Sequence, residues 1–576
     1  MERPYTVHLQ LLRNRERAWR TLVPIARHPL RLIHSGGIYE FAGGVYGNGK
    51  ETGGRSKFSI TLYDLPALGS GQQDRLTHSL EGLDIVDFTI DPSQDLLILV
   101  VLAPRNSEFI YNLYLRSMTT NQAHPFAAAP IFCCMRRPEH LGYIDGAVRV
   151  RISGSLVGFL IKEVVNSVGG HFEVYNWKTG GPVNGCVVRH ASGIEDFIFL
   201  SQDRFLLVRP NGMFEVYSFS DPGFNPGTPV LKARFEFPAL SEDYRYWYIC
   251  LGSNPSPGYD PGAGNYGRNR TCYPSPAERL HACCIYVHRP ESITIHSFVF
   301  FFRATIFTDL PAEWTKHTRH TTNPYVRSPV YHIPWEVWGP KNTRWFRECF
   351  SKDWQHSVYG LRTIECVTDI NAVDGTHDGP EGGIREADDE DSDTDEDNMG
   401  MQNSAEQISS GIRNAGTSDF NLSASILMPP TSNLESRTRS RRSHQPTLKH
   451  LRMRDFNPYN ISRALDHWKR DVRDEGGGGD PAVWHDYSEP QGIANGKNPA
   501  WDDKYSTKRQ RRIIIGKSTV EVCGVFKSNI VSQLPYVEVV TEREYDTTEV
   551  MMDDCRLLLL KGSKREIEIH ECVQPA

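Results

Sequence analysis

The strongest constraint on the fold is a strand pattern that repeats along the chain. Units that begin at Ile85, Tyr143 and Ile194 each contain three short hydrophobic strands, and they lie roughly 50–60 residues apart. Similar residues recur at the same place in successive units, since His171–Trp177 (HFEVYNW) resembles Met213–Phe219 (MFEVYSF). Strands at this spacing, separated by polar turns, are typical of the blades of a β-propeller.

The turns between these strands recur as well. Asp91–Asp95 (DPSQD) and Ser201–Asp203 (SQD) each join one hydrophobic strand to the next. Asp, Ser and Pro favour turns because they bond to nearby backbone or fix its angles. Without two low-complexity stretches, roughly 450 residues remain, which is about seven blades at this spacing. We therefore expect an all-β, β-propeller-like fold of about seven blades.

The remaining segments interrupt or precede the strands. Leu9, Leu12, Trp19 and Leu22 recur near helical spacing, which predicts a short amphipathic helix at the N-terminus. Two stretches are rich in Gly, Ser and charge, and such composition is typical of disorder. The expected order is a helical segment at 1–28, blades at 29–370, an acidic and then Arg/Ser-rich disordered insertion at 371–449, a propeller strand and turn at 450–470, a flexible insertion at 471–510 and closing strands at 511–576.

Composition limits the partners and the compartment. The net charge is −6, which argues against a nucleic-acid partner. The most apolar windows, Asp95–Pro104 and Ser297–Phe302, are too short to cross a bilayer, so no membrane partner is expected. Met1–Arg20 lacks the apolar run of a signal peptide, and the 12 cysteines form no CxxC pair. We expect a cytoplasmic or nuclear protein, or one found in both compartments, with reduced thiols.

Three motifs resemble ligand sites by their letters. Gly44–Lys50 fits the start of a phosphate-binding loop, but Glu51 replaces the required Ser or Thr. Gly262–Gly267 fits GxGxxG inside a Pro-rich loop, where no strand and helix flank it. His281 precedes Cys283 and Cys284 without a second ligand pair, which favours buried thiols at the start of a strand. We expect no cofactor and no bound metal.

We also expect no catalytic residues. An enzyme with its site in the propeller channel would need carboxylates or histidines that converge from several blades. The repeats instead place Leu, Ile, Val, Phe and Tyr at strand positions. Inspection of the channel separates the two readings.

The candidate protein-binding residues are Trp335, Trp338, Arg344 and Trp345, the densest aromatic group in the chain. Trp and Arg dominate protein-binding hot spots because they offer large contact areas and several donors. The same tryptophans could instead fill gaps between blades, and both readings stay open at this point.

The acidic run 386–397 suggests a modification site. Ser392 and Thr394 are each followed three residues later by an acid, which suits acid-directed kinases. The alternative is a solvated loop that keeps the protein soluble. Two basic runs, Ser436–His444 and Lys508–Arg512, are candidate nuclear import signals.

Several segments together carry a family resemblance. They are Leu11–Leu22 (LLRNRERAWRTL), Tyr39–Gly49 (YEFAGGVYGNG), Phe88–Val101 (FTIDPSQDLLILVV), Ile333–Phe346 (IPWEVWGPKNTRWF), Val358–Arg362 (VYGLR), Asp455–Tyr459 (DFNPY), Ser532–Tyr536 (SQLPY) and Val550–Leu560 (VMMDDCRLLLL). In this order, they make the chain resemble basidiomycete fungal F-box proteins in the part that follows their F-box.

The resemblance implies a propeller-like module that recognises substrates of a cullin–RING ubiquitin ligase. An F-box would precede that module and bind the cullin adaptor. Only ten residues precede Leu11, so we expect no F-box in this chain and an adaptor partner only if an upstream F-box exists. The alternative is a stand-alone scaffold propeller that binds other proteins.

Overall fold

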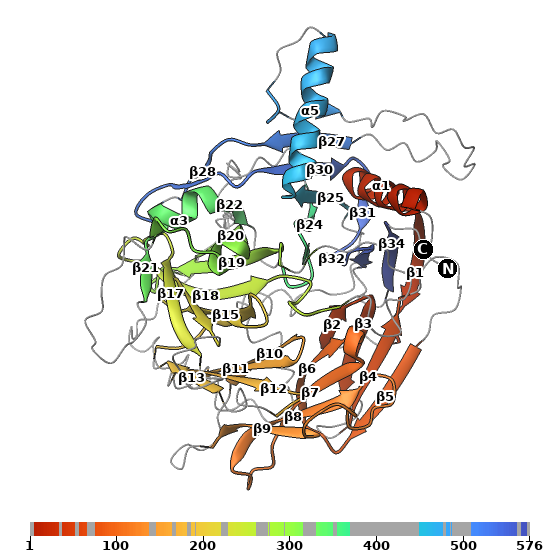
Figure 1. Cartoon of the computed structure of the whole chain (residues 1–576), viewed down its shortest axis with the longest axis vertical. Helices are drawn as coiled ribbons and strands as arrows, with labels where there is room; N and C mark the ends of the chain where they lie inside the picture. The colour runs from red at the N-terminus through yellow and green to blue at the C-terminus, as the bar shows by residue number, and fades with distance from the viewer. Residues whose placement is uncertain are drawn as a thin grey trace, which may run out of the picture.

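The computed structural model describes residues 5–33, 37–51, 57–65, 75–137, 146–163, 169–180, 186–190, 192–219, 229–260, 275, 277–292, 294–314, 330–348, 354–368, 448–475, 480–483, 485–486, 509–522, 524–561 and 566–572. Seven sheets, antiparallel except for one added strand in the fourth, stand around a common centre as the blades of a propeller (Figure 1). The predicted fold class and the predicted blade number are therefore confirmed.

The blades follow one another in chain order, and each begins with its innermost strand. Blade 1 contains β2 (Ile38–Ala42), β3 (Val45–Glu51), β4 (Lys57–Asp64) and β5 (Arg75–Glu81), and blade 2 contains β6 (Ile85–Asp91), β7 (Leu96–Leu102), β8 (Phe109–Ser117) and β9 (Ile131–Arg136). Blade 3 contains β10 (Gly146–Ser153), β11 (Leu156–Glu163), β12 (Gly170–Asn176) and β13 (Cys186–His190). Blade 4 contains β14 (Asp196–Phe199), β15 (Arg204–Arg209), β16 (Met213–Ser218), β17 (Val230–Glu236) and β21 (Tyr331–Ile333), which runs parallel to β17.

The last three blades are less regular. Blade 5 contains β18 (Arg245–Gly252), β19 (Leu280–His288), β20 (Ile295–Arg303) and β22 (Thr343–Glu348); blade 6 contains β23 (Val358–Tyr359), β24 (Arg362–Val367), β25 (Leu448–Asp455), β30 (Tyr536–Thr541), β27 (Arg509–Ile514) and β26 (His485–Asp486), with β31 (Tyr545–Asp546) beside β25; blade 7 contains β32 (Glu549–Met552), β33 (Arg556–Leu560), β34 (Glu566–Glu571) and β1 (Ala26–Arg31). The strands β28 (Ser518–Val520) and β29 (Ile530–Ser532) form a separate pair.

The ring is closed by its two chain ends. The N-terminal strand β1 pairs antiparallel with β34, so that Ala26 faces Glu571 and Arg31 faces Glu566. Blade 7 thus combines strands from both ends of the chain, and unfolding either end opens the ring. The predicted boundary between the helical segment (1–28) and the blades (29–370) is wrong here, because residues 26–28 already belong to a blade strand. Arg27, His28 and Pro29 give that strand no apolar pattern. An outermost strand tolerates such residues, since one of its edges makes no ladder bonds.

The hydrophobic core is divided among the contacts between neighbouring blades. In β7, alternate residues point to opposite faces of the sheet. Leu96, Ile98 and Val100 pack against blade 3, whereas Leu97 and Leu99 pack against blade 1. A middle strand buried on both faces explains why Asp95–Pro104 is apolar without being a membrane segment.

The repeated Phe-Glu-Val-Tyr segments join each blade to the preceding one. In β12, the Glu173 carboxylate accepts hydrogen bonds from Tyr175 Oη and from the backbone N–H of Met135, on β9 of blade 2. In β16, Glu215 accepts a bond from Tyr217 Oη and lies 3.1 Å from His190 Nε2, on β13 of blade 3. The sequence repeat therefore encodes a buried carboxylate that contacts the outermost strand of its neighbour.

Helices supplement the sheets. α1 (Tyr5–Thr21) confirms the predicted N-terminal helix, and a 3-10 turn, η1 (Pro92–Gln94), follows β6. α2 (Thr305–Thr308) and α3 (Trp335–Asn342) lie between strands of blade 5. α5 (Pro458–Glu475) projects from blade 6 in Figure 1. None of the helices in the described part of the chain is long and apolar enough to cross a membrane.

The helix α5 differs from the predicted strand and turn over 450–470. β25 supplies the strand, but the chain continues as an 18-residue helix from Pro458. Ile461, Ala464, Leu465 and Trp468 pack into the core at helical spacing, so the period that predicts this helix is present in the sequence.

Candidate functional site

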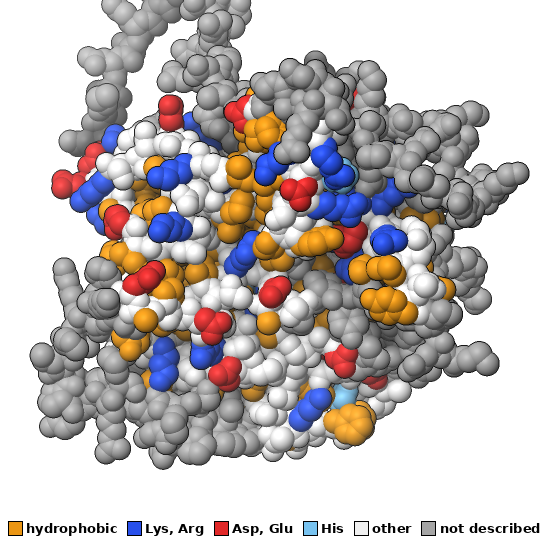
Figure 2. Space-filling model, turned by 45° about the horizontal axis from the view of Figure 1, so that its top comes forward, with side chains coloured by type: hydrophobic (Ala, Val, Ile, Leu, Met, Phe, Trp, Pro, Cys, Tyr) orange, Lys and Arg blue, Asp and Glu red, His pale blue; other side chains and the backbone are white. Residues whose placement is uncertain are grey.

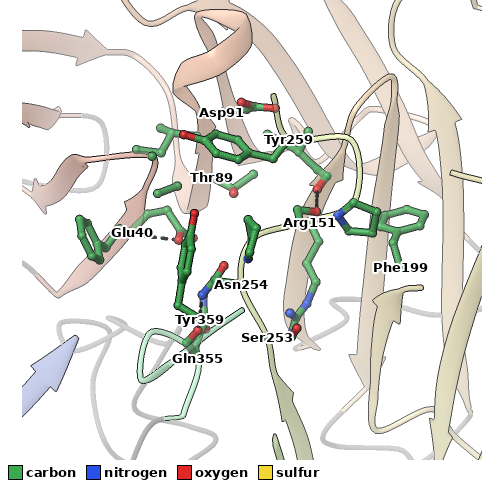
Figure 3. A pocket seen from close by; sticks show the side chains of 18 of the residues that line it. Glu40, Thr89, Asp91, Arg151, Phe199, Ser253, Asn254, Tyr259, Gln355 and Tyr359 are labelled. Carbon is green, nitrogen blue, oxygen red and sulfur yellow. Dashed lines mark hydrogen bonds between the residues drawn. The ribbon is translucent and has the colours of Figure 1, made fainter. Parts of the chain in front are cut away.

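The candidate site is a cavity where the innermost strands end, hereafter the channel-mouth cavity. Its wall combines the ends of β2, β6, β10, β14 and β32 with the segment Ser253–Tyr259 (Figure 3). Its volume is about 100 Å³. Small-molecule sites usually measure ~300–1,000 Å³, so this cavity suits a compact group.

The segment Ser253–Tyr259 lies across this end of the channel and is anchored on both sides. Ser256 Oγ donates to the carbonyl of Ile152, and Ser153 Oγ donates to the carbonyl of Pro257 at 2.8 Å. Asn254 Nδ2 donates to the carbonyl of Gln355 at 2.6 Å (Figure 3). The segment is therefore part of the cavity wall.

The recurrent turns support the same wall. Gln94, in the DPSQD turn, donates to the carbonyl of Gly154 at 2.8 Å. Gln202, in the SQD turn, donates to Ser153 Oγ at 3.1 Å and to the carbonyl of Pro257 at 3.0 Å. Both glutamines thus converge on the first turn of blade 3. This contact between blades explains why the two turns share a glutamine.

Arginines from blade 3 meet one buried carboxylate at the cavity. Arg149 Nε and Arg151 Nη2 lie 3.6 Å and 3.5 Å from the carboxylate of Asp196, which is 1% exposed. Arg151 also donates to the carbonyl of Leu251 at 2.7 Å, and Asp196 accepts the N–H of Leu251 at 2.7 Å. This network joins blades 3, 4 and 5 behind the cavity.

Three carboxylates also border the cavity, which bears on the enzyme alternative. Asp91 accepts bonds from Ser93 and Gln94, and burial raises its pKa. Asp553 accepts bonds from the N–H groups of Cys555 and Arg556, and Glu40 accepts one from Phe41. Asp91 and Asp553 shape turns as Asx residues do. These bonds give the carboxylates structural roles, and the expectation of no catalysis stays a prediction.

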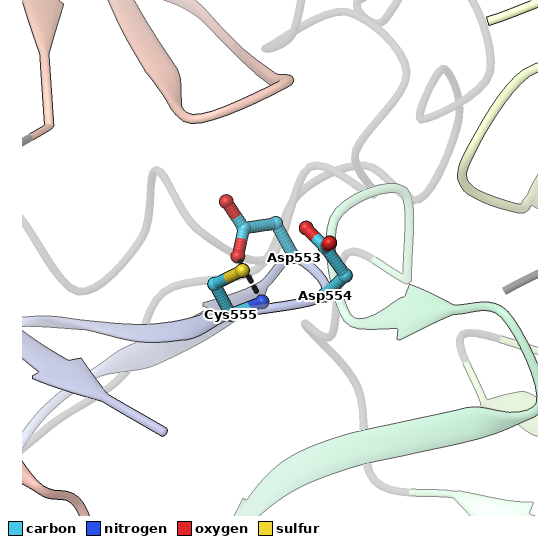
Figure 4. A group of neighbouring side chains, drawn as sticks. All are labelled: Asp553, Asp554 and Cys555. Atoms are coloured by element: carbon cyan, nitrogen blue, oxygen red, sulfur yellow. Dashed lines mark hydrogen bonds between the residues drawn. The ribbon is translucent and has the colours of Figure 1, made fainter. Parts of the chain in front are cut away.

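The group Asp553, Asp554 and Cys555 has side-chain ligand atoms within 4.8 Å of one another (Figure 4). One Asp553 oxygen accepts the N–H bonds of the turn, and the other lies 3.1 Å from the Arg556 guanidinium. Both oxygens of Asp553 therefore already have partners within the turn that joins β32 to β33. The closeness of the three side chains is a consequence of this hairpin turn.

The predicted protein-binding tryptophans lie in the interior. Trp335 and Trp338 belong to α3, Trp345 belongs to β22, and their exposed fractions are 7%, 0% and 1%. The Trp345 ring stacks on Phe300 with centroids 4.6 Å apart. Arg344, 1% exposed, donates to the carbonyls of Leu534 and Gly516 and to Ser518 Oγ. The four side chains are buried, as the alternative reading of core packing expects, and they present no surface to a partner protein in this structure.

The other predicted ligand motifs resolve as strand or lie outside the described residues. Gly44–Lys50 forms a turn residue followed by most of β3. Gly47 is needed there for packing, because a Cβ at this position would lie only 2.9 Å from the Phe88 ring. His281, Cys283 and Cys284 are buried in β19. Apart from the hairpin turn above, no group of three metal-ligating side chains occurs within the described ranges. Gly262–Gly267, Ser392, Thr394 and Ser436–His444 lie outside the described residues.

Of the basic run Lys508–Arg512, residues 509–512 belong to β27, and Lys508 lies outside the described residues. Arg511 and Arg512 are 4% and 7% exposed, and Arg512 Nε donates to Glu538 at 2.7 Å. Side chains buried in this way are not available to an import receptor in the folded protein. On the face in Figure 2, basic groups gather at the upper right with acidic groups among them.

Four segments that carry the family resemblance meet at Arg362. Its Nη2 donates to Glu16 of α1 at 2.6 Å, and its Nε donates to Asp455 at 3.0 Å. Its guanidinium lies 5.5 Å from the ring centroid of Trp19, whose Nε1 donates to the carbonyl of Asp554. We call Glu16, Trp19, Arg362 and Asp455 the helix junction; it holds α1 against blades 6 and 7.

One surface feature was not predicted, namely the loop between β8 and β9 (residues 118–130), hereafter the Phe126 loop. No Asp, Glu, Lys or Arg occurs between Arg116 and Arg136. Phe126 is 72% exposed and Ile131 is 37% exposed, and Pro125, Ala128 and Pro130 are also exposed. The uncharged, apolar composition of this segment could have indicated an exposed binding loop. From the sequence alone, however, the same composition is equally compatible with a buried core segment.

The backbone of this loop is held in place. His124 is buried, its Nε2 bonds to the carbonyl of Gln94 at 2.9 Å, and its Nδ1 accepts the N–H of Phe126. The N–H of Ala128 donates to the carbonyl of Trp177 at 2.8 Å. Since Gln94 also bonds Asp91 at the cavity wall, the Phe126 loop is linked to the channel mouth.

Comparison with known proteins identifies no family for this chain. No protein-family model and no curated protein matches the sequence. Among solved structures, the chain is similar to the β-propeller domain of Myceliophteria thermophila Cps50 (Swd1), with 10% identity and a TM-score of 0.23 over 49% of this chain and 87% of that one. At this level of likeness we draw no argument from it, and the propeller assignment rests on the sheet topology.

Proposed function

We propose that this chain is a protein-binding propeller and that the Phe126 loop is a contact surface for its partner. A propeller is a rigid scaffold whose loops carry the recognition residues. The observation that carries the proposal is the 72% exposure of Phe126 on a loop whose backbone is fixed by hydrogen bonds. An aromatic side chain presented in this way loses little conformational entropy on binding.

The test compares proteins that co-purify with tagged wild type, Phe126→Asp and Tyr459→Asp, with quantitative mass spectrometry. Tyr459 is a matched control, because it is 71% exposed and belongs to α5 of blade 6, whereas the Phe126 loop belongs to blade 2. We expect Phe126→Asp to lose a partner by tenfold or more, as at a hot spot worth ~2 kcal/mol, and Tyr459→Asp to keep it. Equal recovery with all three proteins would refute this surface.

On the sequence resemblance, we further propose that the bound protein is a ubiquitin-ligase substrate. The support for this proposal is the order of the resembling segments along the chain, four of which meet at the helix junction around Arg362. The same purification from the native cell tests this proposal. Near-stoichiometric recovery of a cullin adaptor would support this proposal and would indicate an F-box upstream of this chain, whereas its absence beside other partners would leave a scaffold propeller.

A further inference from the structure

The outer edge of blade 2 is open where the Phe126 loop runs into β9. β9 is the outermost strand of this blade, at the rim of the molecule in Figure 1, and in the described part of the chain it pairs only with β8. The carbonyl of Pro130 accepts the N–H of Leu115 on β8. Backbone groups of an antiparallel strand alternate in direction. The N–H and carbonyl groups of Ile131 and Cys133 therefore point away from β8.

Blade 3 covers this edge only at its far end. The N–H of Met135 donates to the carboxylate of Glu173 at 3.1 Å. Tyr175 Oη donates to the carbonyl of Cys133 at 3.4 Å, which is long for a bond of this type. Among the described residues, no side chain or loop bonds the N–H or carbonyl of Ile131 or the N–H of Cys133. Both residues are exposed, so another chain can reach these groups.

The open edge of β9 also lacks the residues that usually prevent pairing with another chain. Outermost strands are commonly protected by charged side chains or by Pro. In β1, Arg27, Pro29 and Arg31 supply both devices, and β13 contains Arg189. The part of β9 from Ile131 to Met135 contains neither a charged residue nor Pro. An exposed, uncharged edge of this kind is a template for an added strand.

We propose that the partner of this propeller adds an extended, uncharged segment to the edge of β9 at Ile131 and Cys133, beside the Phe126 loop. This inference rests on the proposed protein-binding function and specifies how the partner is bound. Unpaired N–H and carbonyl groups in a row recognise an extended backbone, and alternate side chains of the added strand supply specificity. A charged segment would lose its hydration here without gaining a counter-charge, since the chain has no charged residue between Arg116 and Arg136.

The test measures hydrogen exchange by mass spectrometry in the full chain, with and without a capped, uncharged peptide of alternating Val and Thr. The same peptide with N-methyl groups on alternate residues is its control, because it lacks the donors for strand pairing. Ile131→Pro removes a donor that β8 does not use, and Ile131→Lys places a charge on the edge. Ile131→Ala is the control variant, since it keeps the N–H and adds no charge. Circular dichroism and the unfolding midpoint verify that each variant is folded.

We expect the Val/Thr peptide to slow exchange of the Cys133 amide by about twofold or more, because an added strand protects the amides that it bonds. The slowing should be absent in Ile131→Pro, in Ile131→Lys and with the N-methylated peptide, and present in Ile131→Ala. Exchange in β1 should not change. Unchanged exchange at Cys133 with the Val/Thr peptide, or slowing that persists in Ile131→Pro, would overturn the proposal.

Co-purification with Ile131→Pro and Ile131→Ala beside Phe126→Asp separates this proposal from the proposed function. A partner that is lost tenfold or more in Ile131→Pro and kept in Ile131→Ala supports strand addition, as for a hot spot. A partner lost only in Phe126→Asp would leave the Phe126 surface intact and exclude strand addition. Dimers of the free chain in sedimentation that dissociate in Ile131→Pro would show that a second copy occupies the edge, which also overturns the proposal.

Discussion

Replacing Arg362 by Met should destabilise the protein more than any loss of a surface ion pair. Arg362 is 12% exposed and bonds Asp455, whose side chain is 4% exposed, and Glu16, at 23%. Met keeps much of the length and packing over Trp19 but removes the charge. Breaking a buried pair by removing one partner usually costs about 3–5 kcal/mol, because the remaining charge is buried without compensation.

The pH dependence of this loss follows from Glu16. Burial by itself raises the pKa of Glu16, but Arg362, Arg15 and the Asn460 amide bring it below its ordinary value. A lowered folded-state pKa means that ionised Glu16 stabilises the fold above its unfolded pKa, and that this contribution fades as pH falls through the folded pKa. Without Arg362 the burial effect dominates, so the gap between wild type and Arg362→Met should narrow in acid.

The assay is urea denaturation at neutral pH and at about pH 4, near the ordinary carboxyl pKa, with Arg289→Met as control. Arg289 lies 3.1 Å from Asp243 in an exposed pair, and such pairs contribute about 0–1 kcal/mol. We expect a loss of about 3–5 kcal/mol for Arg362→Met at neutral pH and at most about 1 kcal/mol for the control. If both variants lose the same free energy of unfolding, or if the gap widens in acid, the reasoning is wrong.

Two further predictions concern buried polar groups. Burial opposes ionisation of Glu215, but His190 and two arginines lower its pKa to about 2, so its contribution to stability is complete above its ordinary pKa of 4.5 and lost as pH falls toward 2. Glu215→Gln should therefore flatten the acid side of a plot of urea midpoint against pH; an unchanged slope would contradict this role. Trp338 Nε1 donates to the carbonyl of Glu236 at 2.8 Å, whereas the buried Nε1 of Trp345 has no partner among the described residues. Trp338→Phe should cost more unfolding free energy than Trp345→Phe by about 1 kcal/mol, the usual net worth of one hydrogen bond, and the reverse order in urea denaturation would exclude this explanation.

Local signals in the sequence were enough to predict the blades. The alternation in β7 and the repeated FEVY segments depend on contacts within a blade or with an adjacent one, so they recur with a readable period. The helix α5 was missed although its period is present, because the polar stretch around it reads as loop. The tryptophan cluster shows a different limit, since hot spots and cores use the same residue types. Burial decides between the two readings, and no local pattern reports it.

The sequence by itself thus determined the repeat, the fold class, the blade number and the N-terminal helix, because each follows from the spacing of apolar residues along the chain. The tertiary structure alone decided how the ring closes, which side chains surround the channel mouth and which aromatic residue stays in solvent. Arg362 and Glu16 are separated by 346 positions, and Ser256 and Ile152 by 104, yet each pair is joined by a hydrogen bond. Contacts between residues so far apart in the sequence form only when the ring of seven blades closes. The sequence of a single strand or turn therefore cannot predict them.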